Sequence, residues 1–395
     1  MTIIIALLFL SLSFVTYFVV KDFFAPIFIV PCLWGLIMFF YAILDHKLNN
    51  LNGQFLIAIS LWVFSFVALS IVTNLFFYPS KEYKNNITLF SPKIFTFYYY
   101  LLVFGGLASI TLLIVEAVKS GPQYFFLRLR IINTGLEEDE TFSLGVLAYV
   151  FNLSTVVVAL FTLYKEKISN KRYTIVLIIS FLLSIITLAR TSIMILVFVI
   201  LLIWKFKHKL KIKKLVKIGL ILGLFLSLLT FFRSFHEEDV SGAEISTTYI
   251  YIFGAMPAFE MINDDNSGDA LFGANTFRFF YAVSNTFGFN FKIEKAILPY
   301  VNMPVLTNVY SVLYPFYVDF GYIGVALFGS IYGFFYTFLY RQAKRSNPIF
   351  IILYSLIFYS LILQFMGEFI FSNFSSLLQF IILIMVPYFF SKIKL

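Results

Sequence analysis

The sequence predicts an all-α membrane protein that crosses the bilayer many times. Hydrophobic residues make up 61% of the 395 residues and charged residues only 12%, whereas a soluble domain has about 25% charged residues. Many apolar runs approach 20 residues, roughly the length that a helix needs to cross the hydrocarbon core of about 30 Å. We therefore expect about 11 transmembrane helices (about 10–12) in a single membrane domain, residues 1–395, with one long extracytoplasmic loop.

The composition also argues against several classes of site and partner. The net charge of +9 comes largely from lysines near helix ends, a pattern typical of membrane topology and not of nucleic-acid binding. Cys32 is the one cysteine, which excludes an intramolecular disulfide and a cysteine metal cluster. The histidines His46, His208 and His236 are far apart in the sequence. We expect no metal site, no cofactor and no nucleic-acid partner.

Eleven apolar runs predict the transmembrane helices. In chain order they are 3–20, 23–44, 54–78, 94–118, 141–164, 173–189, 191–204, 215–232, 321–340, 348–366 and 370–390.

Lysine and arginine in the short connections predict which side of the membrane each connection faces. The basic groups lie at 165–172, 205–217, 341–345 and 392–394. Assigning all four to the cytoplasm gives a consistent topology, with the C-terminus inside and the N-terminus outside. The loops 119–140 and 233–305 then face the extracytoplasmic side. The second loop carries nine acidic residues against four basic ones, which agrees with that side.

Arg190 is the most informative single residue. The run 173–204 has basic residues at both ends, so both ends should be cytoplasmic and the run should form a hairpin. Two helices that share these residues reach only about 24 Å each, which is short of the ~30 Å core. A charged residue held at depth costs roughly 2.5–3.5 kcal/mol. We therefore expect Arg190 to face a polar cavity or an anionic partner; the alternative is that it reaches up to the outer headgroups.

Further arginines share this outer face. Arg233 ends the next apolar run, Arg278 lies among aromatic residues, and Arg128 and Arg130 belong to the 119–140 loop. Taken singly, each could be an interface anchor or a surface residue. Together they indicate phosphate binding, because the planar guanidinium fork binds phosphate oxygens two at a time. The set predicts a site for a lipid-linked phosphate or pyrophosphate.

Three residues are candidates for proton transfer. Asp319 lies at the mouth of a span, where it could act as a base, pair with an arginine or cap the helix. Glu260 and His236 lie in the long loop. Either could also be an ordinary solvated loop residue.

With these residues in view, the chain resembles the bacterial O-antigen polymerases, the Wzy-type oligosaccharide repeat unit polymerases. The resemblance covers most of the chain, by layout more than by identity. Four blocks carry it: Leu188-Ala189-Arg190-Thr191-Ser192, Phe231-Phe232-Arg233-Ser234, Phe272-Gly273-Ala274-Asn275-Thr276-Phe277, and Thr307-Asn308-Val309-Tyr310-Ser311 running into Asp319-Phe320-Gly321-Tyr322-Ile323-Gly324. Some members carry outer-loop repeats of arginine and glycine at a fixed distance. That spacing is missing after Arg233 and Arg278, so the resemblance implies no loop-shuttling mechanism.

The resemblance implies a glycosyltransferase in the bacterial inner membrane, with its active site facing the periplasm. It would move a growing glycan from undecaprenyl pyrophosphate onto a new lipid-linked repeat unit, without a metal. Membrane lipids and a chain-length regulator are further candidate partners. O-antigen ligase, a flippase for lipid-linked repeat units and a scaffold component remain alternatives.

Residue roles follow from the same resemblance. The substrate-binding set would hold the pyrophosphates and the glycan, and the catalytic set would supply or orient a base. The first set is Arg190, Arg233, Arg278, Asn308, Tyr310, Arg128 and Arg130, and the second is Asp319, Glu260 and His236.

Overall fold

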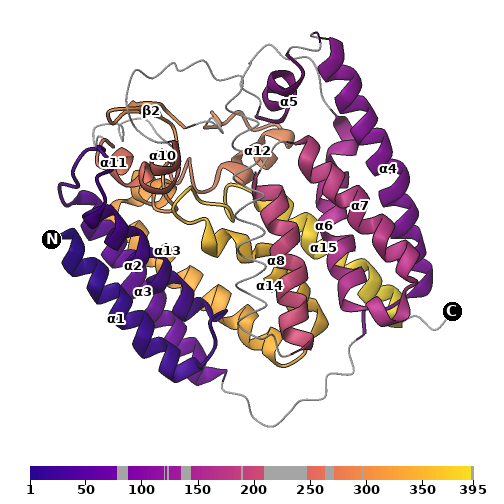
Figure 1. Ribbon diagram of the computed structural model, residues 1–395, viewed down its shortest axis with the longest axis horizontal. Coiled ribbons are helices and arrows are strands. Elements are labelled where there is room, and N and C mark those ends of the chain that lie inside the picture. The colour runs from indigo at the N-terminus through magenta and orange to yellow at the C-terminus, as the bar shows by residue number, and fades with distance from the viewer. Residues whose placement is uncertain are drawn as a thin grey trace. The chain divides into compact units, whose positions relative to one another are not determined.

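The computed structural model describes residues 1–77, 88–119, 121, 124–134, 144–187, 190–208, 247–262, 271–294 and 298–392. The chain divides into two compact units. Unit one contains Met1–Glu82, Ser241–Arg341 and Ser360–Ser375, and unit two contains Tyr83–Val240, Gln342–Tyr359 and Ser376–Leu395. Figure 1 shows that helices form most of the described chain.

The predicted all-α, multi-pass fold is confirmed. Seven of the described helical stretches are long and apolar enough to cross a membrane. They are α1 (Thr2–Val20), α2 (Pro26–Ile43), α3 (Gln54–Phe76), α4 (Pro92–Lys119), η2 with α6 (Gly145–Ala148 and Tyr149–Leu163), α13 (Tyr314–Lys344) and α15 (Phe374–Lys392).

Three more helices coincide with predicted spans but are shorter or more charged. They are α7 (Asn170–Ile186), α8 (Arg190–Lys207) and α14 (Pro348–Ile362). The predicted span 215–232 lies outside the described residues. The remaining elements are short: α5 (Phe125–Thr134), η3 (Lys165–Lys167), α10 (Thr247–Phe253), α11 (Ala255–Phe259), α12 (Arg278–Thr286), and the antiparallel pair β1 (Val301–Asn302) and β2 (Leu306–Thr307).

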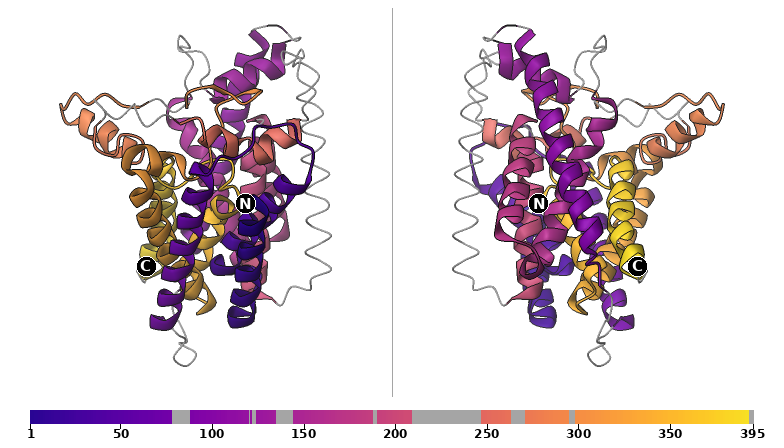
Figure 2. Two further views of the ribbon diagram at one scale, coloured as in Figure 1. Left: turned by 90° about the vertical axis from the view of Figure 1, so that its left-hand side faces the viewer. Right: turned by 90° about the vertical axis from the view of Figure 1, so that its right-hand side faces the viewer.

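In unit one, α1, α2 and α3 lie side by side (Figure 1), and Figure 2 shows them running along a common direction. Helix α3 packs closely along α13. A Cβ atom at Gly329 or Gly333 of α13 would collide with the α3 backbone or with Ser65. Glycine at both positions therefore allows the two backbones to approach within contact distance.

The start of α13 and the N-terminus lie at the same end of unit one. Helices α3 and α13 run parallel, because Gly329 lies against Trp62 and Gly333 against Phe66. At the far end, the Tyr340 hydroxyl donates to Asp22, just after α1, at 2.6 Å. The start of α1 is therefore at the end where α13 begins, which agrees with the predicted placement of the N-terminus on the side of the long loop.

Helix α13 is interrupted at Gly321. This residue has φ 61° and ψ −154°, a combination that essentially only glycine adopts. The interruption separates the first turns of α13, which carry Asp319, from the long apolar part that follows.

The connection 363–373 between α14 and α15 is also non-helical and lies within unit one. Gln364 anchors it: its side-chain oxygen accepts hydrogen bonds from the indole N–H groups of Trp34 (3.0 Å) and Trp62 (3.1 Å). Its backbone oxygen accepts from Val312 N (2.7 Å). The connection is thus fixed against α2, α3 and the segment that leads into α13.

In unit two, α4, α6, α7 and α8 pack against one another (Figure 1). The hairpin predicted around Arg190 is confirmed: α7 ends at Ile186 and α8 begins at Arg190. Lys207 Nζ, at the end of α8, donates to Leu163 O (2.9 Å) and Glu166 (3.2 Å), so both ends of the hairpin meet the end of α6. With 17 and 18 residues, the helices reach only about 26–27 Å.

Candidate functional site

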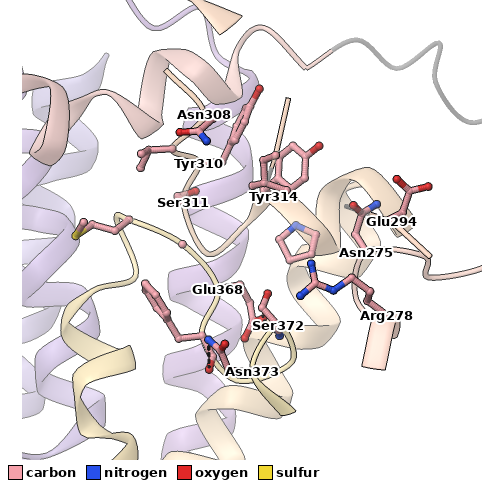
Figure 3. A pocket seen from close by; sticks show the side chains of 16 residues that line it. Asn275, Arg278, Glu294, Asn308, Tyr310, Ser311, Tyr314, Glu368, Ser372 and Asn373 are labelled. Atoms are coloured by element: carbon pink, nitrogen blue, oxygen red, sulfur yellow. Dashed lines mark hydrogen bonds between the residues drawn. The ribbon is translucent and has the colours of Figure 1, made fainter. Parts of the chain in front are cut away.

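A cavity of about 310 Å³ lies in unit one at the end where α13 begins (Figure 3). Its walls come from the start of α12, from Glu294 and Leu298, from the approach to α13, and from the 363–373 connection, which is distant from the others in the sequence. The residues that line it are Asn275, Arg278, Glu294, Leu298, Asn308, Val309, Tyr310, Ser311, Tyr314, Pro315, Met366, Gly367, Glu368, Phe369, Ser372 and Asn373.

Glu368 organises one wall of the cavity. It is only 7% exposed, and its Oε1 accepts hydrogen bonds from Ile370 N (2.6 Å), Phe371 N (2.9 Å) and the Tyr332 hydroxyl. Its Oε2 accepts from the backbone N (2.7 Å) and the hydroxyl (2.9 Å) of Ser372. Five donors use the acceptor capacity of this carboxylate. Glu368 therefore holds the 363–373 connection in its folded-back path and presents Ser372 and Asn373 to the cavity.

Sequence reasoning missed Glu368. It stands between two predicted spans, 348–366 and 370–390, in a short connection. The signal was present, because an acidic side chain inside a long apolar region is costly and marks a site or a buried partner. What the pattern could not show is that the connection folds back, so that its own N–H groups surround the carboxylate.

Arg278 is the first residue of α12, and its guanidinium points into the cavity from the side opposite Glu368 and Ser372 (Figure 3). Burial lowers the pKa of Arg278, and the charge of Glu368 acts in the opposite direction. Among the described residues, no hydrogen bond or ion pair engages the guanidinium. A half-buried cation with free donors suits an anion that enters the cavity.

Asp319 positions the segment that carries Arg278. It lies inside α13, two residues before Gly321, and it does not line the cavity. Its Oδ1 accepts from the backbone N (3.2 Å) and side-chain N (2.8 Å) of Asn275, and its Oδ2 accepts from Thr276 N (2.7 Å). The carboxylate thus ties residues 275–276 to α13. Within the part of the chain that the structure describes, it is bound neither to an arginine nor to the start of its own helix.

Phe277 completes this attachment. Its ring packs against those of Phe320, Phe328 and Phe371, with centroid distances of 6.1 to 6.3 Å. The residue before Arg278 is therefore fixed by aromatic contacts to α13 and to the 363–373 connection. Arg278 therefore directly follows a residue, Phe277, that these ring contacts hold in place.

Glu260 binds backbone N–H groups at the start of another helix, α3. Its Oε1 accepts from Gly53 N (3.1 Å) and Phe55 N (3.0 Å) at the start of α3. A carboxylate at this position satisfies free N–H groups and complements the helix dipole. Glu260 does not line the cavity, so its predicted catalytic role finds no support in this geometry.

Asn308 and Tyr310 line the cavity, as does Arg278, so the structure brings these three predicted residues together. The β1–β2 pair leads the chain to them, with Val301 opposite Thr307. The Tyr310 hydroxyl donates to Pro299 O (3.1 Å), and burial raises its pKa. Their role in glycan binding stays a prediction.

Glu294 is the second carboxylate of the cavity. It is partly buried at the rim (Figure 3), and within the described residues no hydrogen bond engages its oxygens. In this respect it differs from Glu368, Asp319 and Glu260.

The other predicted residues lie elsewhere. Arg190 begins α8 and Arg130 belongs to α5, both in unit two, and their side chains are outside what the structure describes. Arg128, also in α5, has a nitrogen 3.9 Å from Glu116 on α4. Arg233 and His236 lie outside the described residues.

Comparison with known proteins gives one match. The model of the family described as "Putative O-antigen polymerase" matches residues 2–365, nearly the whole chain. No curated protein and no solved structure matches this chain.

Proposed function

We propose that this chain, which belongs to the O-antigen polymerase family, transfers a growing glycan from undecaprenyl pyrophosphate onto a new lipid-linked repeat unit. The family implies a lipid-linked oligosaccharide as substrate, and the chain is a multi-pass membrane protein. The proposal places the reaction at the periplasmic face of the bacterial inner membrane. Support for that side comes from the acidic long loop and the lysine-rich short connections.

The observation that carries the proposal is the guanidinium of Arg278 in the cavity. In the transfer, the bond between the sugar C1 and the pyrophosphate oxygen breaks, and its electron pair leaves with the pyrophosphate. A preorganised cation stabilises the charge that develops there, and more strongly in a partly desolvated site. Arginine would supply this charge without a metal.

The acceptor hydroxyl forms the new bond to C1 and must lose its proton. We assign that proton to Glu294, since Asp319 and Glu260 already accept backbone N–H groups. His236, outside the described residues, stays a candidate. A general base contributes about 10²- to 10⁴-fold to the rate.

Two lipid-linked substrates bring two pyrophosphates. Arg190 and Arg233 are proposed for the second pyrophosphate, with Arg128 and Arg130 as supporting charges, and a chain-length regulator as a protein partner. These assignments rest on the sequence and the family resemblance.

The test is the surface polysaccharide of cells in which this gene is deleted and then restored. With Arg278→Ala at the wild-type protein level, we expect the ladder to collapse to core plus a single repeat unit, because a lost charge-stabilising donor costs about 10²- to 10³-fold in rate. Lys292→Ala, an exposed cation in the same part of the chain, should keep the ladder. A full ladder with Arg278→Ala would remove Arg278 from the mechanism.

The deletion itself separates the alternatives. Collapse to a single repeat unit supports a polymerase, because export and ligation survive. Loss of every repeat, including the single one, would indicate a ligase or a flippase instead. An unchanged ladder would exclude all three activities.

A further inference from the structure

The segment 278–293, here called the aromatic segment, exposes an unusual amount of apolar surface for part of a loop. It begins with α12, the amphipathic helix Arg278–Thr286, and continues without regular structure. Phe287 is 79% exposed and Phe289 is 61% exposed, and Phe280, Val283 and Ile293 are also exposed. So many exposed apolar side chains in one short segment indicate an interaction surface.

The aromatic segment packs against the start of one span, α15. The Phe280 ring lies 5.1 Å from Phe374, the first residue of α15. Because α15 has 19 residues, it covers about 28 Å, nearly the full ~30 Å hydrocarbon core. Phe374 is therefore at the hydrocarbon boundary, and so is the helix that packs on it. In Figure 2 the aromatic segment is the salmon-coloured arm that extends sideways beyond the end of the orange helix α13.

The internal contacts of the aromatic segment also suit an environment with little water. Asn285 closes it internally: its Oδ1 accepts from Phe291 N (2.8 Å) and its Nδ2 donates to Phe291 O (2.9 Å). The rings of Phe289 and Phe291 stack at 5.6 Å, and Tyr281 packs on Phe291 at 5.2 Å. A loop that satisfies both backbone groups of Phe291 internally and presents aromatic rings is well suited to the boundary between water and lipid.

We propose that the aromatic segment lies in the interfacial layer of the bilayer, with Phe287 and Phe289 among the lipid chains. The partner is lipid because the patch packs at the hydrocarbon boundary of α15 and is rich in aromatic residues. Lys292 beside it can keep its ammonium group among the headgroups.

This placement also fixes the depth of Arg278, the first residue of the segment. The guanidinium would then lie near the level of the lipid phosphates, where a lipid-linked pyrophosphate presents its charge. That last step rests on the proposed function, whereas the lipid contact does not.

The test is spin-label accessibility in proteoliposomes of phosphatidylethanolamine and phosphatidylglycerol. In a Cys32→Ala background, single labels are placed through Phe287→Cys, Phe289→Cys and Lys292→Cys. Phe104→Cys, at a 68%-exposed position within α4, gives the lipid reference, and free label in buffer gives the water reference. Collision rates are measured with oxygen, which concentrates in lipid, and with a neutral nickel chelate, which stays in water.

We expect oxygen collisions to exceed nickel collisions at 287 and 289, so that the logarithm of their ratio is positive, as at 104. At 292 the ratio should shift toward the water reference. Nickel access equal to or above oxygen access at 287 and 289 would overturn the proposal, because the segment would be in water. Low access to both reagents would also overturn it, because protein would then cover the patch.

Each purified variant must elute in detergent as a single peak at the wild-type position, which shows that it folds. The accessibility measurement needs no substrate, so it can succeed while the Arg278→Ala test fails, or the reverse. Failure of the lipid contact and failure of the proposed function are thus distinguishable.

Discussion

Unit one contains two irregular connections that are built alike but serve different ends. The connection 44–53 leads into α3, and the connection 363–373 leads into α15. At each, one carboxylate accepts backbone N–H groups just before or at the helix start. Glu260, from a distant part of the chain, does so for the first connection, and Glu368, within the connection itself, does so for the second. Only the second shares its cavity with an arginine. Both carboxylates hold backbone in place, and the cation that faces the cavity distinguishes the second place from the first.

Removing Glu368 should have the largest effect. Glu368→Ala leaves three backbone N–H groups, one buried and two partly buried, and two hydroxyls without their acceptor, and each such loss in a buried place costs about 1–3 kcal/mol. Allowing for relaxation, we expect the free energy of unfolding to fall by about 3–5 kcal/mol. Thermal unfolding in detergent measures the loss. Glu294→Gln, in the same cavity, is the control and should leave the melting temperature nearly unchanged.

Arg278→Lys tests whether activity needs the planar guanidinium group of arginine or only its positive charge. The lysine keeps a charge but cannot bind two phosphate oxygens at once, so we expect about a tenfold or greater loss of rate. Burial lowers a lysine pKa, and the charged form exists below that pKa. Activity of the variant should therefore fall further as the pH rises, while the wild type keeps its arginine charged. Rates of the purified enzyme across alkaline pH check this; parallel profiles would contradict it.

Asp319→Asn tests positioning. The asparagine keeps one acceptor oxygen and loses the other, so the segment 275–276 loosens and Arg278 loses its fixed place. We expect a decrease in kcat of roughly tenfold with a smaller change in KM, since misplacement affects the transition state most. Asp22→Asn, at the opposite end of unit one, is the matched control. Equal effects of the two variants on kcat would show a merely structural role.

Glu260→Gln tests the carboxylate of the first connection. It removes the charge at the start of α3 but leaves an acceptor, so the cost to stability should be about 1 kcal/mol or less. Activity per folded molecule should stay at the wild-type level, because Glu260 does not line the cavity. The melting temperature measures the loss of stability, and the specific activity of the folded protein measures any loss of function. A selective loss of activity would restore Glu260 as a catalytic candidate.

The smallest effect concerns His46 in the same connection. Leu48 N donates to His46 Nδ1 (3.0 Å), and Nε2 donates to Tyr41 O (3.0 Å). Burial lowers the pKa of His46, partly offset by the bond to Tyr41 and the charge of Asp45. Its neutral form therefore contributes stability above the unfolded pKa of roughly 6.5, and this contribution is lost as the pH falls through the lower folded pKa. We expect less than about 1 kcal/mol, seen as a steeper acid decline in melting temperature than in His46→Phe.

The helices could be predicted because the bilayer fixes their length and composition locally. The same local reasoning found the hairpin at Arg190 from its basic ends. Pairing across the chain could not be predicted in this way. Asp319 meets Asn275, 44 residues away, and Glu260 meets Gly53, 207 residues away. Charged residues could therefore be recognised as important, but whether each supports the backbone or faces the cavity depends on contacts that no periodicity records.

Glycine is favoured at positions 321 and 333 for two different physical reasons. At Gly333 a Cβ would strike Phe66, so the limit is space; at Gly321 nothing lies within 4 Å, and the limit is the backbone itself. Mirroring φ 61° and ψ −154° gives angles in the polyproline II region. Position 321 thus has the handedness of a D-amino acid. Synthesis with D-alanine there would preserve the backbone path that L-alanine opposes, a consequence of chirality and not of volume.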